Sequence, residues 1–348
     1  MRRFYVLFLL LMVACDSRGT TGIPPDLPEI PASLEKQLAF TCAYEKDKLP
    51  PLDPELDQLF KRAVWIYKQN RLKNDPEEYA KAERLYRIAA AHGHYKAINN
   101  LTNFILQGWS VATGNVDLVV DMTEDLIQRG IPVGYFNMGV LLDRGYGVKP
   151  DEKAALQYFR KAADLGNPEA QYYVGSQLSS LTAANPIPYE IGNKMIQCAG
   201  EQGHAKAASE TGAYFMDIDI RPAEALKYYH LATKAGSSTA AFVLYEQFLA
   251  EPPNTELGLI RDEERSRRYD AIRHILHGYD YLGATVDEID RIVPLPPAKL
   301  PPWDGQLEWV QRWNANVPPR IPDEERIAEL AKAKGLDPAT GRPVRETP

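Results

Sequence analysis

Histidine and cysteine are the residues of this chain whose side chains could bind a metal, take part in catalysis or be modified. His274 and His277 stand three apart in a charged helical segment, so one helix face could present both imidazoles, but no carboxylate spacing around them completes a known metal motif. The sequence also lacks a Gly-x-Ser-x-Gly elbow, a phosphate-binding loop, a dinucleotide fingerprint and a paired Cys-x-x-Cys. We therefore predict no catalytic residue, no metal and no cofactor, and a protein that is not an enzyme.

Cys15 is the residue whose surroundings indicate a specific chemical modification. Two arginines and an apolar run over residues 4–14 precede it, which is typical of a secretory signal and too short for a membrane span of about 20 residues. The segment Met12-Val13-Ala14-Cys15 resembles a lipobox, which implies that residues 1–14 are a lipoprotein signal peptide and that the Cys15 thiol is acylated. The lipid would then be the protein's contact with a membrane. The alternative is a plain signal peptide with an incidental cysteine.

An exported, lipid-anchored chain is expected in the periplasm, on the inner or the outer membrane. Asp16 resembles the inner-membrane retention signal of enteric bacteria, whereas other bacteria use later positions, so both membranes remain open. Without residues 1–14 the chain has 38 Lys and Arg against 47 Asp and Glu, a net charge of −9. That charge disfavours nucleic acid and favours a basic protein face as partner. An oxidising compartment permits a Cys42–Cys198 disulfide, and burial of Cys198 as a small apolar residue is the alternative.

Glycine recurs at a regular interval, and this interval predicts the elements that carry the rest of the chain. The spacings are 37, 36, 37 and 33 residues between Gly93, Gly130, Gly166, Gly203 and Gly236. A small residue follows each of these glycines four positions later, and in three units a second glycine follows nine positions later: Gly139, Gly175 and Gly212. Each unit is therefore predicted to be a helix, a left-handed glycine that ends it, and a second helix that packs closely against its neighbours.

The unit over residues 139–170 carries the clearest pattern, with a glycine-rich loop from Arg144 to Asp151 between two helical segments. This unit closely resembles the Sel-like repeat, a relative of the tetratricopeptide repeat, and the other units share its core positions. The resemblance implies an all-α fold, a right-handed α-solenoid of helix-turn-helix repeats over residues 55–250, whose extended surface binds a protein partner.

The two ends of the chain differ from the repeats. Residues 15–54 are polar and Pro-rich, which indicates a lipid-anchored tether without fixed structure. Residues 251–348 are predicted to form a helical and Pro-rich cap that contains Trp303, Trp309 and Trp313. These tryptophans either pack inward over the last repeat or form a contact surface. Segments 303–309 and 335–343 look like a C-terminal domain seen on Sel-like repeat proteins of proteobacteria.

A lipid-anchored, exported and acidic Sel-like repeat protein is similar to the periplasmic immunity proteins that accompany type VI secretion phospholipase effectors. That similarity implies neutralisation of a secreted phospholipase by direct binding, with an acidic face against the positive charge of the toxin's phosphate site. The alternative is an envelope scaffold or regulatory adaptor that binds a cell-wall or signalling protein. Besides the three tryptophans, the expected contact residues are Arg144, Tyr146 and Lys149 of the glycine-rich loop.

Overall fold

The computed structural model describes residues 36, 38–110, 116–181, 186–251 and 255–344. The chain divides into two compact units, Met1–Gln37 and Leu38–Pro348, and the second unit is the one described below. The predicted signal peptide, Cys15 and Asp16 lie outside the described residues. In the part that is described, no helix is both long and apolar enough to cross a membrane.

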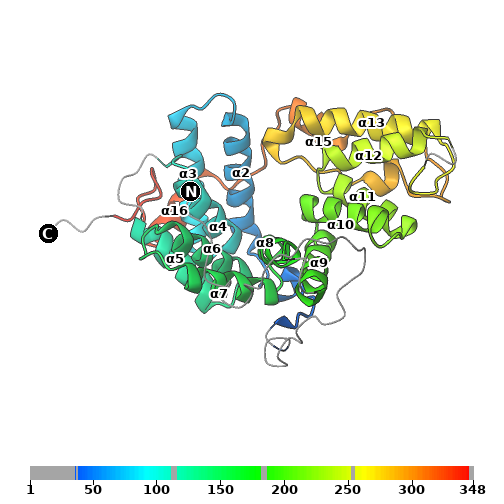
Figure 1. The fold of residues 1–348 in the computed structure, drawn as a ribbon. Coiled ribbons are helices and arrows are strands. Elements are labelled where there is room, and N and C mark those ends of the chain that lie inside the picture. The colour runs from blue at the N-terminus through cyan, green and yellow to red at the C-terminus, as the bar shows by residue number, and fades with distance from the viewer. Residues whose placement is uncertain (1–35, 37, 111–115, 182–185, 252–254, 345–348) are drawn as a thin grey trace. The chain divides into compact units, whose positions relative to one another are not determined.

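The second unit is a series of packed helices (Figure 1), and its described residues include an isolated β-bridge between Leu336 and Pro343. Consecutive helices form hairpins: α2 (Pro54–Asn70) with α3 (Pro76–Ala91), α4 (Tyr95–Leu106) with α5 (Val116–Gln128), α6 (Pro132–Arg144) with α7 (Glu152–Asp164), α8 (Pro168–Ser179) with α9 (Pro186–Glu201), α10 (Ala205–Asp217) with α11 (Pro222–Lys234), and α12 (Ser238–Leu249) with α13 (Glu263–Gly278). Shorter helices complete the unit: η1 (Glu45–Lys48), η2 (Asp280–Leu282), α14 (Ile289–Ile292), α15 (Glu308–Asn314) and α16 (Glu324–Lys332). The predicted all-α solenoid is confirmed.

The five periodic glycines lie in the turns that join one hairpin to the next. Each has a positive φ, between 69° and 107°, in the region that favours glycine. After four of the five glycines, a side chain caps the next helix by accepting from the backbone N–H of the small residue three positions on; Ile131, which follows Gly130, makes no such bond. Asn167 Oδ1 accepts from Ala170 N at 2.9 Å, and Ser237 Oγ accepts from Ala240 N at 3.0 Å. The glycine ends one helix and the following residue begins another.

The second set of glycines lies inside the hairpins, where the helices come closest. A Cβ on Gly139 would lie 2.6 Å from the ring of Phe159, and one on Gly175 would lie 2.8 Å from the carbonyl oxygen of Gly192. Gly212 faces the ring of Tyr229 in the same way, at 3.0 Å. Only glycine fits at these positions, because the facing helix occupies the space that a Cβ would take.

The hairpin pattern continues beyond residue 250, where we placed the end of the solenoid. Helix α13 packs on α12 as the second helix of a further hairpin, and Tyr269 and Ile272 of α13 belong to the same core as Leu244 and Phe248 of α12. The core residues from α10 to Leu307 form one cluster, and those of α2 to α6 form another. The C-terminal region therefore begins after Gly278.

The C-terminal region contacts both ends of the helical series, which differs from the expected cap over the last layer. Leu307 and Trp309 pack on the core of α10 to α13, whereas Ile327 and Leu330 of α16 pack into the core of α2 to α6. Figure 1 shows α15 beside α13 and α16 beside α3 and α4. Between them, Pro319 O accepts a hydrogen bond from Arg62 Nε of α2 at 2.9 Å. Residues 316–344 thus join the last hairpin to the first.

Candidate protein-binding surface

The helical series has two edges, because consecutive packed helices run in opposite directions. The turn edge carries the turns of Gly93, Gly130, Gly166, Gly203 and Gly236. The tip edge carries the loops within hairpins, which follow Asn70, Leu106, Arg144, Ser179, Asp217 and Leu249. The two edges differ in how much of each is covered by the chain itself.

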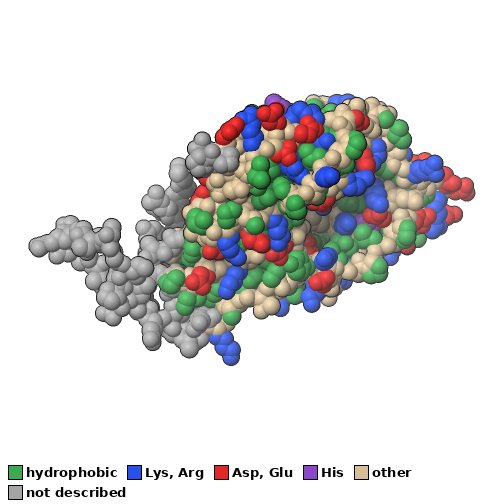
Figure 2. Space-filling model, turned by 90° about the vertical axis from the view of Figure 1, so that its right-hand side faces the viewer, with side chains coloured by type: hydrophobic (Ala, Val, Ile, Leu, Met, Phe, Trp, Pro, Cys, Tyr) green, Lys and Arg blue, Asp and Glu red, His purple; other side chains and the backbone are tan. Residues whose placement is uncertain are grey.

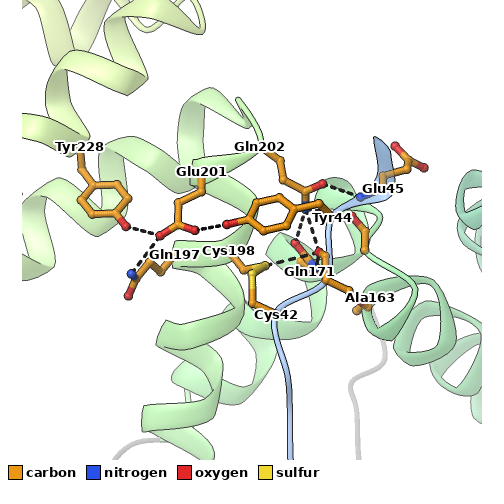
Figure 3. The surroundings of a disulfide bond; sticks show 12 residues. Cys42, Tyr44, Glu45, Ala163, Gln171, Gln197, Cys198, Glu201, Gln202 and Tyr228 are labelled. Carbon is orange, nitrogen blue, oxygen red and sulfur yellow. Dashed lines mark hydrogen bonds between the residues drawn. A yellow bond between two sulfur atoms is a disulfide. The ribbon is translucent and has the colours of Figure 1, made fainter. Parts of the chain in front are cut away.

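Residues 42–45 cross the turn edge at two neighbouring turns (Figure 3). Gln171 Nε2 donates to Ala43 O at 2.9 Å, and Glu45 N donates to Gln202 Oε1 at 2.7 Å. A Cβ on Gly166 would lie 2.6 Å from the backbone of this segment, so the glycine permits its close approach. We expected the whole of residues 15–54 to be a tether, and in the structure the part from residue 38 onward lies against the repeats.

A disulfide joins Cys42 of this segment to Cys198 of α9, 156 residues away in sequence. Beside it, Glu201 accepts hydrogen bonds from the hydroxyls of Tyr44 and Tyr228, both at 2.6 Å. Burial alone would raise the pKa of Glu201, but the hydrogen bonds from Tyr228, Tyr44 and Gln197 together lower it. The anionic carboxylate therefore ties the N-terminal segment to α9 and α11. Of the two alternatives for Cys198, the structure has the disulfide.

The C-terminal region covers two further turns. Val286 N donates to Lys234 O at 2.8 Å beside Gly236, and a Cβ on Gly236 would lie 2.2 Å from Ala284 O. At the other end of the series, His92 Nε2 lies 2.9 Å from Leu330 O of α16. A recess of about 370 Å³ remains near the Gly203 turn. Most of the turn edge is thus occupied by the protein's own segments.

The tip edge instead presents large apolar side chains to solvent. Seven of the eleven exposed large apolar residues in the described chain belong to it: Leu72, Val116, Leu181, Ile218, Ile220, Leu249 and Ile260. Ile218 and Ile220, in the loop between α10 and α11, are 62% and 65% exposed. The seven residues are spread over the tips of five hairpins, but Ile218 and Ile220 share one loop; neighbouring exposed apolar residues indicate an interaction surface, whereas single scattered ones do not.

A groove of about 570 Å³ lies between α9 and α10 beside this loop. Its lining includes the carboxylates Glu190, Glu210, Asp217 and Asp219 and the cations Lys194 and Arg221. Arg221 pairs with Asp219 at 2.7 Å and lies over the ring of Phe215 at 4.0 Å. Figure 2 shows one face of the molecule, on which hydrophobic, basic and acidic side chains are intermixed around a hollow. Charges of both signs therefore lie on the face in this view.

Two tyrosines of the groove supply aromatic faces with polar tips. The rings of Tyr189 and Tyr214 lie 6.3 Å apart, between the two helices. Burial, and then the nearby carboxylate of Asp219, raise the pKa of Tyr214. Its hydroxyl therefore stays protonated at neutral pH and can donate a hydrogen bond to a ligand.

The three residues predicted in the glycine-rich loop lie at the tip of the α6–α7 hairpin, on the tip edge. Arg144 and Lys149 are exposed, and Tyr146 is half-buried against the core of the first hairpins. The structure thus places this loop on the same edge as the groove, one hairpin removed from it.

The three tryptophans lie in the C-terminal region and are half-buried. Trp303 and Trp309 pack against the core of the last hairpins. Trp303 Nε1 donates to Gln306 O at 2.8 Å, and the ring of Trp309 meets that of Tyr279 edge-on at 5.1 Å. These two rings occupy the inward-packed arrangement, one of the two that we considered.

Four of the histidines cap helices or join elements, whereas His274 and His277 lie exposed on α13. His94 and His204 each use Nδ1 to accept a backbone hydrogen bond at the start of α4 and α10. His230 lies buried between Tyr269 and Asp290. Among the described residues, no group of three or more His, Cys, Asp or Glu side chains is arranged to hold a metal ion.

The residues of the groove were not singled out from the sequence. A usable signal is the segment Asp217-Ile218-Asp219-Ile220-Arg221, which puts two isoleucines in a loop where the α6–α7 repeat has Gly145 and Gly147. The apolar side chains there have no helical spacing, so the segment does not stand out as part of a binding surface.

The fold defines the protein as an α-solenoid of Sel-like repeats whose turn edge is largely covered by its own segments. The Sel1 repeat model matches residues 72–94, 132–167 and 205–237, and a domain of unknown function, DUF6396, matches residues 240–344. A comparison with curated proteins gave no match.

Three solved structures from Pseudomonas aeruginosa are similar to this chain. They are protein 5086 (PA5086), immunity protein Pa5087 and immunity protein PA5088, each 29% identical, with TM-scores of 0.55, 0.54 and 0.55. Each match covers 74% of this chain and 94% or 95% of the other. The chain is therefore a Sel-like repeat relative of immunity proteins, and this similarity supports a protein-binding role.

Proposed function

We propose that the protein is a periplasmic, lipid-anchored immunity protein that binds and neutralises a type VI secretion phospholipase. The observation that carries this proposal is its similarity to Pa5087 and PA5088, which extends over nearly their whole length. A match of that extent takes in most of the helical series and is not confined to a single repeat.

The disulfide supports the proposed compartment. Structural disulfides persist in exported proteins and are rare in the reducing cytosol of most bacteria. Cys198 is almost fully buried in its bond to Cys42. A protein that carries this bond is suited to the periplasm, which is where it would bind an incoming toxin.

Co-expression in a host bacterium tests the function. Periplasm-directed phospholipases of type VI effectors would be expressed with and without the full chain. We expect the chain to restore growth against its cognate enzyme and to inhibit that purified enzyme at equimolar concentration. A chain that neutralises none of the enzymes and binds none of them would show that the proposal is wrong.

A second experiment tests the anchor. Cells that express the wild type or the Cys15→Ser variant would be labelled with a clickable palmitate analogue and fractionated. We expect label and membrane association in the wild type alone. Equal labelling of both proteins would contradict acylation at Cys15.

A further inference from the structure

We propose that the partner is held on the tip edge at the groove between α9 and α10, through a protein segment whose apolar tip is flanked by lysine or arginine. This inference rests on the proposed function, because it states where the toxin binds and which chemistry the toxin presents. Three observations lead to it: the covered turn edge, the fixed apolar loop and the charges of the groove.

The turn edge is a poor site for a partner because the chain already occupies it. The Cys42–Cys198 bond and the hydrogen bonds of residues 42–45 hold one segment there. Ala284 and Leu330 cover turns on either side. A partner on this edge would have to displace a disulfide-linked segment, whereas the tip edge needs no displacement.

The loop between α10 and α11 holds its apolar side chains in fixed positions. Asp219 N donates to Tyr214 O at 3.0 Å, and Arg221 N donates to Phe215 O at 2.7 Å. The guanidinium of Arg221 lies over the Phe215 ring and pairs with Asp219. Because the loop is already ordered, burying Ile218 and Ile220 against a partner costs little conformational entropy.

The charges of the groove favour a basic partner. Four carboxylates face two cations, and Asp219 and Arg221 satisfy each other. Glu210 accepts from the Tyr172 hydroxyl at 2.8 Å. In the described chain, Glu190 and Asp217 have no ion pair within 4.0 Å, and a partner that covers them must bring positive charge to offset their desolvation. The faces of Tyr189 and Tyr214 add aromatic surface that attracts a cation.

Binding to the phospholipase that the wild type neutralises tests the inference. The probe is that enzyme with its catalytic residue inactivated, and affinity is measured by calorimetry at two salt concentrations. One variant combines Ile218→Ser with Ile220→Ser, and another combines Glu190→Lys with Asp217→Lys. Matched controls are Leu72→Ser, at the tip of the first hairpin, and Asp121→Lys, an exposed acid in the middle of α5.

We expect each groove variant to weaken binding at least tenfold and each control to change it less than twofold. The charge variant should also reduce the salt dependence of the affinity. Thermal unfolding of all four variants should match the wild type, because the altered side chains are exposed.

Other outcomes overturn the inference in distinguishable ways. If both groove variants bind like the wild type, the surface is wrong and the immunity function stands. If Leu72→Ser weakens binding as much as the isoleucine variant, the site is not the groove. If the charge variant binds normally, the basic character of the partner is wrong. If the wild type neutralises no toxin, the function and this inference both fall.

Discussion

Histidine can take part in catalysis or metal binding, but in the turns of this fold it has a structural role as a helix cap. His94, Asn167 and His204 each follow a turn glycine, and each accepts a backbone hydrogen bond at 2.9 to 3.1 Å. The imidazole of His204 also stacks on Tyr172, with ring centroids 4.5 Å apart. Comparison between the repeats predicts a turn position here, since asparagine can replace histidine at a helix cap but does not replace it as a metal ligand.

Substitution of His204 tests the capping role. His204→Ala leaves the N–H of Ala207 without its acceptor, and we expect the free energy of unfolding to fall by about 1 kcal/mol. His204→Asn keeps an acceptor and should cost less. Urea unfolding followed by circular dichroism measures both. Equal losses in the two variants would show that stacking or the contact with Glu169, and not capping, sets the cost.

The buried imidazole of His230 makes the free energy of unfolding depend on pH. Burial lowers its pKa, although Asp290, 2.9 Å from Nε2, opposes this shift. The unfolded chain, with a histidine pKa near 6.5, therefore takes up the proton first. The stability that neutral His230 contributes is complete above pH 6.5 and is lost as the pH falls below that value. We expect unfolding free energies measured between pH 7.5 and 5 to decline, and His230→Gln to remove part of the decline.

At the scale of elements, two kinds of glycine build the hairpins in different ways. Gly130 is in a turn with a φ of 69° and has open space where a Cβ would lie. Gly192 lies inside α9, where a Cβ would stand 2.6 Å from Gly175 O of α8. Gly130 is required because the backbone there is left-handed, and Gly192 is required because the neighbouring helix leaves no space for a side chain.

Alanine substitution separates these two needs. We expect Gly130→Ala to cost about 1 kcal/mol, because a left-handed conformation is unfavourable with a Cβ. Gly192→Ala should cost about 1–3 kcal/mol, because it forces α8 and α9 apart. Gly278, which has neither a positive φ nor a neighbour within 4 Å, is the control and should be neutral or stabilising. Thermal unfolding measures all three, and a destabilised Gly278→Ala would contradict this division.

Elements with local signals could be predicted from the sequence, and elements placed by distant contacts could not. The periodic glycines locate all five turns because a left-handed residue is required at each one. Nothing near Tyr44 indicates that its hydroxyl reaches Glu201, 157 residues away, so the sequence predicts a tether around it. The groove was missed for the same reason, since α9 and α10 contribute side chains that only packing brings together.

At the scale of the whole second unit, the C-terminal region links the two ends of the helical series. Arg84 pairs with Glu324 at 2.7 Å, and Arg326 pairs with Glu55 at 2.9 Å, so α16 is bound to the first hairpin by charge at its rim. Exposed ion pairs contribute little. Ile327, which is fully buried, holds the helix in place.

Substitution in α16 tests this link. Ile327→Asp with Leu330→Asp should release α16 from the first hairpin, because buried carboxylates without partners are costly. We expect limited proteolysis to cut the chain between residues 316 and 344 in this variant and to leave the last hairpins intact. Glu325→Gln, on the exposed side of α16, is the control. Resistance of the double variant to cleavage would show that the link does not depend on these side chains.

The contact between His92 and Leu330 spans 238 residues of sequence. In most helical repeat proteins the contacts are local, and each repeat completes its packing soon after synthesis. Here the packing of the hairpin that is synthesised first is completed only by α16, which is synthesised among the last segments. At ribosomal speed this delays the packing by a time on the order of 10–50 s. During that interval the apolar face that later receives α16 is uncovered. The nascent chain therefore has its aggregation-prone surface at its leading end, where a holding chaperone would first meet it.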